Sequence, residues 1–160
     1  MRNKEYSKLS VAETTIFIVV SEFNQPIIEN LLKGALDAFA HHGGKESGMH
    51  IHRVPGAFEI PGTIVQIMKN HSPDAIVALG AVIRGETPHF DYIAGESAKG
   101  IAEISRSSNI PIINGILTTD NARQAEDRSQ VGGRNKGWDA MEAALQTINV
   151  YQEIFSASKC

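Results

Sequence analysis

The sequence contains one cysteine, little net charge and no long apolar run, and each shortage excludes a class of protein. A single cysteine cannot form an internal disulfide. This cysteine, Cys160, is the last of 160 residues, and a chain end holds a nucleophile too loosely for catalysis. The formal net charge of −3 gives no field that attracts a polyanion, so we expect neither nucleic acid nor a membrane surface as a partner. No apolar segment approaches the length that spans a membrane.

The composition is that of one globular domain. Hydrophobic residues make up 42% and charged residues 21% of the chain, and 160 residues suit one core better than two. We expect a single domain over residues 1–160. The stretch 1–12 is polar and lacks the apolar core of a signal peptide, so we expect a cytoplasmic protein in which this stretch is a flexible extension.

Four apolar runs predict β-strands. Three of them are nearly continuous in Ile, Val, Ala and Leu, as in parallel strands that are covered on both faces. The second run alternates more and predicts an edge strand. The four predicted strands are residues 15–20, 49–54, 74–83 and 110–117.

Helical patterns separate these strands and follow the last one. The first has Pro26 in its first turn and ends at Gly43-Gly44, as expected for a helix start and stop. This alternation predicts right-handed crossovers and a three-layer α/β sandwich, with helices flanking a central four-stranded parallel sheet. The predicted helices are residues 26–39, 61–70, 88–106, 120–129 with Asp120 as N-cap, and 136–155.

Ligands in open α/β sheets bind beyond the carboxyl ends of the strands. Of the loops at that edge, residues 84–89 are the most informative. We expect Thr87 to be the N-cap of the next helix and Pro88 its first residue. The free N–H groups of Glu86 and Thr87, with the helix dipole, then suit an anion, and His89 lies within reach for proton transfer. Alternatively, the loop is only a good helix start and His89 a surface residue. The loops selected by the rule are residues 21–24, 55–59, 84–89 and 114–120.

Two further charged residues are candidates for ligand binding. Glu59 lies among apolar neighbours in a turn rich in Pro and Gly, where its carboxylate can accept hydrogen bonds from a ligand or cap the following helix. Arg128 ends the short helix after the fourth strand, where it can hold a phosphate or be a solvated basic residue. The histidines have no Cys, Asp or Glu at ligand spacing, so we expect them to be solvated and expect no metal; they are His41, His42, His50 and His52.

Taken together, these segments resemble the lumazine synthase family, over residues 15 to 155. Several motifs in one order at matching separations are far more specific than any single motif. The carrying segments are Phe23-Asn24, residues 54–61 (VPGAFEIP), 80–91 (GAVIRGETPHFD), 115–119 (GILTT) and 135–137 (NKG).

The resemblance implies a flavodoxin-like fold and a transferase that needs no cofactor. Its substrates would be the small molecules 5-amino-6-(D-ribitylamino)uracil and 3,4-dihydroxy-2-butanone 4-phosphate. The products would be 6,7-dimethyl-8-ribityllumazine, phosphate and water, in the penultimate step of riboflavin biosynthesis. Matching positions imply that His89 transfers protons and that Glu86, Thr87 and Arg128 hold the phosphate. The uracil substrate would contact Phe23, Ala57, Phe58, Glu59, Ala81, Val82, Ile83 and residue 114.

The resemblance also implies a homopentamer whose active sites span neighbouring subunits. Residue 114 and Arg128 would then serve the adjacent subunit's pocket. The chain has Asn114 where many members have an aromatic residue, and an asparagine stacks less well on a pyrimidine. The turn 129–137 has the length of the type that packs twelve pentamers into an icosahedral shell of 60 subunits but lacks its lysine, so we favour the pentamer and leave the shell open. Two alternatives are a non-catalytic lumazine- or flavin-binding relative and a shell that encloses another protein.

Overall fold

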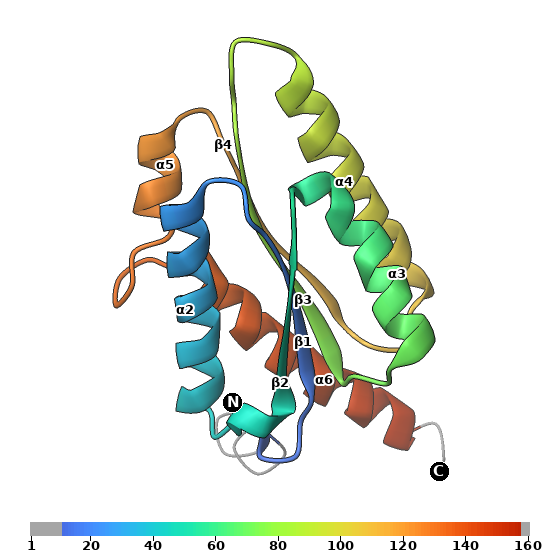
Figure 1. Cartoon of the computed structure of the whole chain (residues 1–160). Coiled ribbons are helices and arrows are strands. Elements are labelled where there is room, and N and C mark those ends of the chain that lie inside the picture. The colour runs from blue at the N-terminus through green and yellow to red at the C-terminus, as the bar shows by residue number, and fades with distance from the viewer. Residues whose placement is uncertain (1–10, 158–160) are drawn as a thin grey trace.

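The computed structural model describes residues 11–157 and contains one parallel sheet (Figure 1). Its strands are β1 (Ile16–Ser21), β2 (Met49–Val54), β3 (Ala75–Ile83) and β4 (Ile112–Thr119), arranged in the order β2-β1-β3-β4. All neighbouring pairs run parallel. The predicted four-stranded parallel sheet is therefore confirmed, with β2 at one edge as expected.

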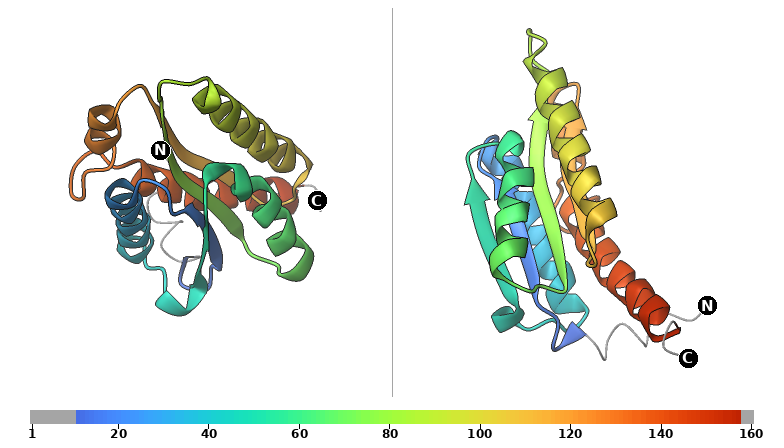
Figure 2. Two further views of the ribbon diagram at one scale, coloured as in Figure 1. Left: turned by 45° about the horizontal axis from the view of Figure 1, so that its top comes forward. Right: turned by 90° about the vertical axis from the view of Figure 1, so that its right-hand side faces the viewer.

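Helices cover both faces of the sheet, which gives the expected three layers (Figures 1 and 2). One face is covered by α2 (Gln25–His41) and α6 (Lys136–Ala157), which pack against each other. The other face is covered by α3 (Ile60–Asn70) and α4 (His89–Ser107). The short helix α5 (Ala122–Asp127) follows β4, and single 3₁₀ turns, η1 (Glu46–Gly48) and η2 (Ala57–Glu59), flank β2.

The core has two halves because side chains along a buried strand alternate between the faces of the sheet. In β1, Ile18 packs with α2 and α6, whereas Val19 packs with α3 and α4. In β3, Val77 and Ala78 divide in the same way. All four side chains are fully buried, which explains why these strands are apolar at consecutive positions.

Two expectations about the last strand and the helix after it are wrong. The strand β4 begins and ends two residues later than predicted, because Thr118 and Thr119 continue the pairing with the end of β3. The N-cap of α5 is Asn121, whose side chain accepts a hydrogen bond from the Gln124 N–H at 2.9 Å. Asp120 instead accepts from Arg84, with Nε and Oδ1 3.0 Å apart.

The N-terminal expectation is only partly within the described residues. Residues 1–10 and Cys160 lie outside them. Val11 is buried and packs into the core beside α2 and α6, so any flexible extension ends before it. None of the helices in the described part of the chain is both long and apolar enough to cross a membrane.

Candidate active site

A cleft of about 650 Å³ opens at the carboxyl edge of the sheet, between the loops after β1, β2 and β3 and the start of α4. It lies at the point where the strand order reverses between β1 and β3, which is where open α/β sheets bind ligands. Most of the residues predicted to contact substrate line this cleft. They are Phe23, Ala57, Phe58, Glu59, Ala81, Val82, Ile83, Thr87 and His89.

Two aromatic side chains at the cleft are unusually open to solvent. Phe23 is 72% and Phe58 56% exposed. Most large apolar side chains of this protein are buried, so aromatic rings left exposed beside a cleft mark a binding surface rather than a packing element. Their faces are free to stack on a flat ring.

Asn24 fixes the loop that carries Phe23. Its backbone is in the left-handed region, with φ 72° and ψ 57°, which asparagine tolerates better than most residues. Its side-chain amide donates to the Ala81 carbonyl at 3.0 Å, so the loop after β1 is tied to the end of β3. The N–H of Glu22 donates to the Val54 carbonyl at 2.8 Å and ties the same loop to the end of β2.

The turn after β2 presents Glu59 to solvent. Its backbone closes a 3₁₀ turn by donating to the Gly56 carbonyl at 3.2 Å. Glu59 occupies the N-cap position of α3, but its side chain makes no capping hydrogen bond. The alternative in which this carboxylate caps the helix is therefore wrong. The Glu59 carboxylate remains available to accept hydrogen bonds from a ligand.

The loop 84–89 starts α4 one residue later than expected. Pro88 is the N-cap, so Thr87 does not cap the helix, and His89 is the first helical residue. Because a proline N-cap has no side-chain acceptor, the turn closes through its own carbonyl, which accepts from the Asp91 N–H at 3.1 Å. His89 is exposed, and no hydrogen bond joins its imidazole to another of residues 11–157. The ring is thus free to meet a ligand.

Arg84 anchors the base of that loop. Its guanidinium is 3.0 Å from the Asp120 carboxylate and 3.6 Å from that of Asp91. It also lies over the Phe90 ring, 4.5 Å from the ring centroid. These contacts hold the end of β3, the start of α4 and the end of β4 together.

Three predicted site residues do not line the cleft. Glu86 is in the same loop, with an exposed side chain. Asn114 lies in the middle of β4, opposite Ala78, and its side chain accepts from the Ile116 N–H at 3.0 Å. Arg128 lines a separate hollow of about 370 Å³, bounded by the second half of β4 and the turn before α6. That hollow and the cleft share no residue.

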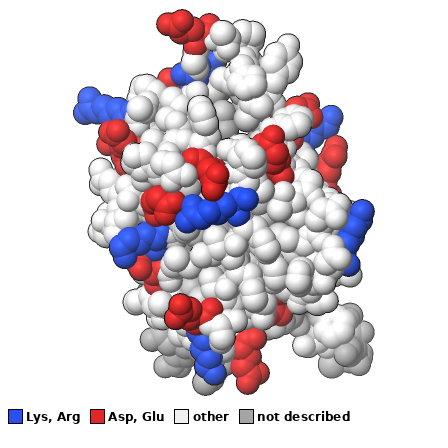
Figure 3. All heavy atoms as spheres, in the orientation of Figure 1, with Lys and Arg blue, Asp and Glu red and all other residues white. Residues whose placement is uncertain are grey.

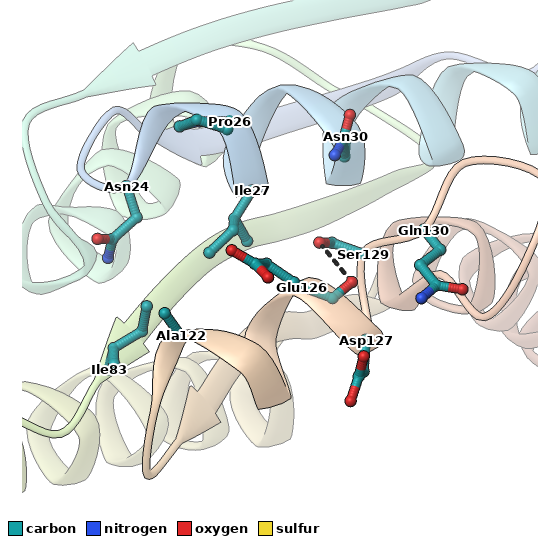
Figure 4. A pocket seen from close by; sticks show the side chains of 10 residues that line it. All are labelled: Asn24, Pro26, Ile27, Asn30, Ile83, Ala122, Glu126, Asp127, Ser129 and Gln130. Atoms are coloured by element: carbon teal, nitrogen blue, oxygen red, sulfur yellow. Dashed lines mark hydrogen bonds between the residues drawn. The ribbon is translucent and has the colours of Figure 1, made fainter.

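Another hollow, of about 460 Å³, lies between the start of α2 and α5 (Figure 4). Its charged residues are Glu126 and Asp127, and its other polar residues are Asn24, Asn30, Ser129 and Gln130. No cation of residues 11–157 lines it, and it therefore does not suit an anion.

The histidines do not form a metal site. Within residues 11–157, no three His, Cys, Asp or Glu side chains gather closely enough to hold a metal ion. His50 and His52 are exposed and stack on the Phe17 ring, at centroid distances of 4.6 and 5.6 Å. His42 pairs with Glu142 at 2.9 Å, so its expected solvation is wrong.

Surface charge is mixed rather than gathered. Acidic and basic side chains are interspersed on the face drawn in Figure 3. Arg53 and Glu29 form one such pair, 2.7 Å apart. The hydrogen bond to Glu29 raises the pKa of Arg53 above its ordinary value.

Sequence reasoning missed several residues of the cleft. Asn24 was only part of a motif, and its left-handed backbone has no signal in the sequence beyond the residue type. Phe90 and Ile93 line the cleft from the first turn of α4. Their spacing of three marks them as one face of the helix, which was a usable signal.

The strand order and the two helical layers are those of a flavodoxin-like α/β protein, and the cleft at the β1/β3 switch point makes it one with a small-molecule site. A model of the 6,7-dimethyl-8-ribityllumazine synthase family matches residues 13–152. The chain belongs to this family and is an enzyme of the transferase class.

Three relatives that carry the name 6,7-dimethyl-8-ribityllumazine synthase are similar over nearly their whole length. The protein of Chlorobium limicola is 43% identical over 145 residues, which cover 91% of this chain and 94% of the relative. That of Chlorobium chlorochromatii is 46% identical, with the same coverage. That of Campylobacter jejuni is 44% identical over 89% of this chain and 93% of the relative.

Proposed function

We propose that this enzyme condenses 5-amino-6-(D-ribitylamino)uracil with 3,4-dihydroxy-2-butanone 4-phosphate. The products are 6,7-dimethyl-8-ribityllumazine, phosphate and water, in the penultimate step of riboflavin biosynthesis in the cytoplasm. The single observation that carries the proposal is the cleft, in which exposed aromatic rings, the Glu59 carboxylate and the His89 imidazole line one space. Membership of the family supports the same reaction.

The cleft supplies what each part of the uracil substrate needs. Phe23 stacks on the pyrimidine, and residues 57–59 and 81–83 bind its polar edge and the ribityl chain. Glu59 accepts hydrogen bonds from N–H or O–H groups of this substrate. Thr87 lies beside His89 at the same cleft, so the phosphate and the proton carrier meet at the start of α4, where backbone N–H groups and the helix dipole favour an anion.

The reaction needs orientation and proton transfer. The primary amine adds to the ketone and loses water to form an imine. Removal of a neighbouring proton then expels phosphate, and the ribityl-bearing nitrogen closes the ring with loss of water. His89 accepts and returns the protons. Each step is an addition or elimination, so the enzyme mainly holds two reactants in the productive geometry, and the chemistry requires no redox cofactor.

Arg128 supports a site shared between subunits. Thr87 lines the cleft, whereas Arg128 of the same chain lines a separate hollow that has no lining residue in common with the cleft. We therefore assign Arg128, with Asn114, to the site of a neighbouring copy in a homopentamer. A shell of 60 subunits is the alternative assembly, and sedimentation velocity separates it from a pentamer by mass.

The experiment that tests the reaction mixes the purified protein with both substrates and follows the absorbance of the bicyclic product. We expect product and phosphate in equal amounts, and neither when one substrate is omitted. Tight binding of the product without turnover of the substrates would contradict the proposal and indicate a non-catalytic binding protein.

A further inference from the structure

The turn before α6 is a small antiparallel hairpin. Ser129 and Asn135 form its bridge. The N–H of Lys136 donates to the Arg128 carbonyl at 2.8 Å, and that of Gln130 donates to the Arg134 carbonyl at 3.0 Å. The side-chain directions in this hairpin therefore alternate with a period of two.

That alternation separates a buried side from an open one. Ser129 is 1% and Asn135 4% exposed, so the bridge residues point into the molecule. Of the four neighbours of these bridge residues in the hairpin, three are cations, and Gln130 lines the hollow between α2 and α5. The three cations, Arg128, Arg134 and Lys136, line the same hollow of about 370 Å³.

Asn135 fixes the hairpin to the body of the protein. Its side-chain amide donates to the Asn30 carbonyl at 2.9 Å, across 105 positions of the chain. The Oδ1 atom of the same side chain accepts from the Trp138 N–H at 3.0 Å. Gly34 leaves room for it, since a Cβ there would lie 2.1 Å from its Oδ1. The backbone that carries the three cations is thus fixed before any ligand arrives, which lowers the entropy cost of binding.

The charge of this hollow is unbalanced. Among the described residues that line it, Asp139 is the only acidic one, against three cations. Within residues 11–157, none of these cations forms an ion pair, whereas Arg53 and Arg84 both do. Arg128 donates to the Gln124 carbonyl at 3.0 Å and keeps the rest of its guanidinium free. Like charges held close together repel each other, and a dianion placed between them removes that repulsion.

We propose that Arg134 is a specificity-determining residue for the phosphate-bearing substrate, because it completes, with Arg128 and Lys136, a hollow for a phosphate monoester. The proposal rests on the proposed function, in which Arg128 holds that phosphate. The same chemistry suits the inorganic phosphate that the reaction releases. Thr118 adds a hydroxyl to the lining, which suits phosphate oxygens as well.

The test compares Arg134→Gln with Arg106→Gln, which removes the same charge from the exposed end of α4. Arg128→Gln serves as the reference for the proposed function. We expect Arg134→Gln to raise KM for the butanone phosphate by about threefold to tenfold at low salt, in line with a charge-assisted contact that solvent partly screens. The KM for the uracil substrate does not rise. The inhibition constant of added inorganic phosphate rises together with the KM for the butanone phosphate.

Three controls separate a binding role from a structural one. The difference in KM between Arg134→Gln and the parent protein shrinks as salt is raised to about 0.5 M, because salt at this concentration screens exposed charges over a few ångströms. Arg134→Lys keeps the cation and restores most of the affinity. Sedimentation velocity on each variant shows whether the assembly has changed, and a KM that follows particle size rather than charge at position 134 overturns the inference.

The remaining outcomes distinguish this inference from the function on which it rests. If Arg134→Gln behaves like Arg106→Gln while Arg128→Gln raises KM, the inference is wrong and the proposed function stands. If neither arginine variant alters KM for the butanone phosphate, the phosphate is held elsewhere, so the inference and the proposed phosphate role of Arg128 both fail while the proposed reaction stands. If the parent protein forms no product, the proposed function itself fails.

Discussion

The cleft and the hollow that contains Arg128, Arg134 and Lys136 are lined by different kinds of side chain. The cleft is lined by three consecutive strand ends and the first turn of α4, and its walls are mainly apolar or aromatic. The hollow is lined by one strand and a hairpin, and it contains three cations beside a single carboxylate. One region suits a flat ring and the other an anion.

Under the proposed function, this difference explains why a single chain is insufficient. The two proposed substrates, one with a pyrimidine and the other with a phosphate, need both kinds of surface within a few ångströms. The chain holds them as two separate hollows with no shared residue. In the homopentamer that we propose, each copy places one region against the other region of its neighbour, because a head-to-tail interface joins two different surfaces.

The largest expected effect comes from His89 in the cleft. His89→Ala lowers kcat by about a hundredfold, because a positioned proton carrier typically contributes 10²–10⁴-fold. Steady-state kinetics with both substrates measures it, and added imidazole restores part of the rate. His41→Ala, which removes another exposed histidine, is the control. A rate equal to that of the control would remove His89 from the mechanism.

The next effect comes from the hollow. Arg128→Ala raises KM for the butanone phosphate by about tenfold or more, since a guanidinium holds phosphate through two parallel hydrogen bonds. The KM for the uracil substrate changes far less. Equal changes in both constants would mean that Arg128 stabilises the protein rather than binding the phosphate.

Phe23 tests the aromatic side of the comparison. Phe23→Ala raises KM for the uracil substrate by about tenfold, given that stacking of a base on an aromatic ring contributes about 1–3 kcal/mol. The KM for the butanone phosphate is little affected. Tyr92→Ala, which removes a ring that is 68% exposed on α4 and lies outside the cleft lining, is the matched control. Similar constants for both variants would disprove the stacking role.

The smallest effect concerns the scaffold of the cleft. Asn24→Gly accepts the positive φ but loses the hydrogen bond to Ala81, and we expect it to lower the free energy of unfolding by about 1 kcal/mol. Asn24→Asp also tolerates the backbone, but it turns an acceptor toward the Ala81 carbonyl and costs about 1 kcal/mol more. Denaturant unfolding at matched protein concentration ranks the two variants. The reverse order would show that the backbone, not the hydrogen bond, is what Asn24 provides.

Most of the fold follows from the sequence because apolar runs and helical periodicity alternate along the whole chain. The edge position of β2 also followed from its pattern. The end of β4 did not, since Thr118 and Thr119 belong to the strand only through their pairing with β3. The prediction that Asp120 caps α5 was wrong for a similar reason, because the Asp120 carboxylate accepts a hydrogen bond from Arg84, which is distant in the sequence.

The candidate site was predictable in its parts but not in its geometry. Segments that line the cleft are contiguous motifs, so the resemblance identified them together. Asn24 needs a left-handed backbone that no pattern announces. Arg134 belongs with Arg128 only because Asn135 pins the hairpin to Asn30, a contact between residues far apart in the chain. Long-range contacts of this kind leave no periodic signal.

Mixed assembly tests the central claim most directly. His89→Ala impairs the cleft and Arg128→Ala the hollow, so at butanone phosphate concentrations well below KM each variant alone retains about one tenth of the parental activity or less. If each site joins the cleft of one copy to the hollow of the next, refolding the two variants together in equal amounts restores about one quarter of the parental activity, because about one interface in four combines two intact regions. Activity that stays at the mean of the two separate variants, with mixed oligomers confirmed by mass, would contradict a shared site.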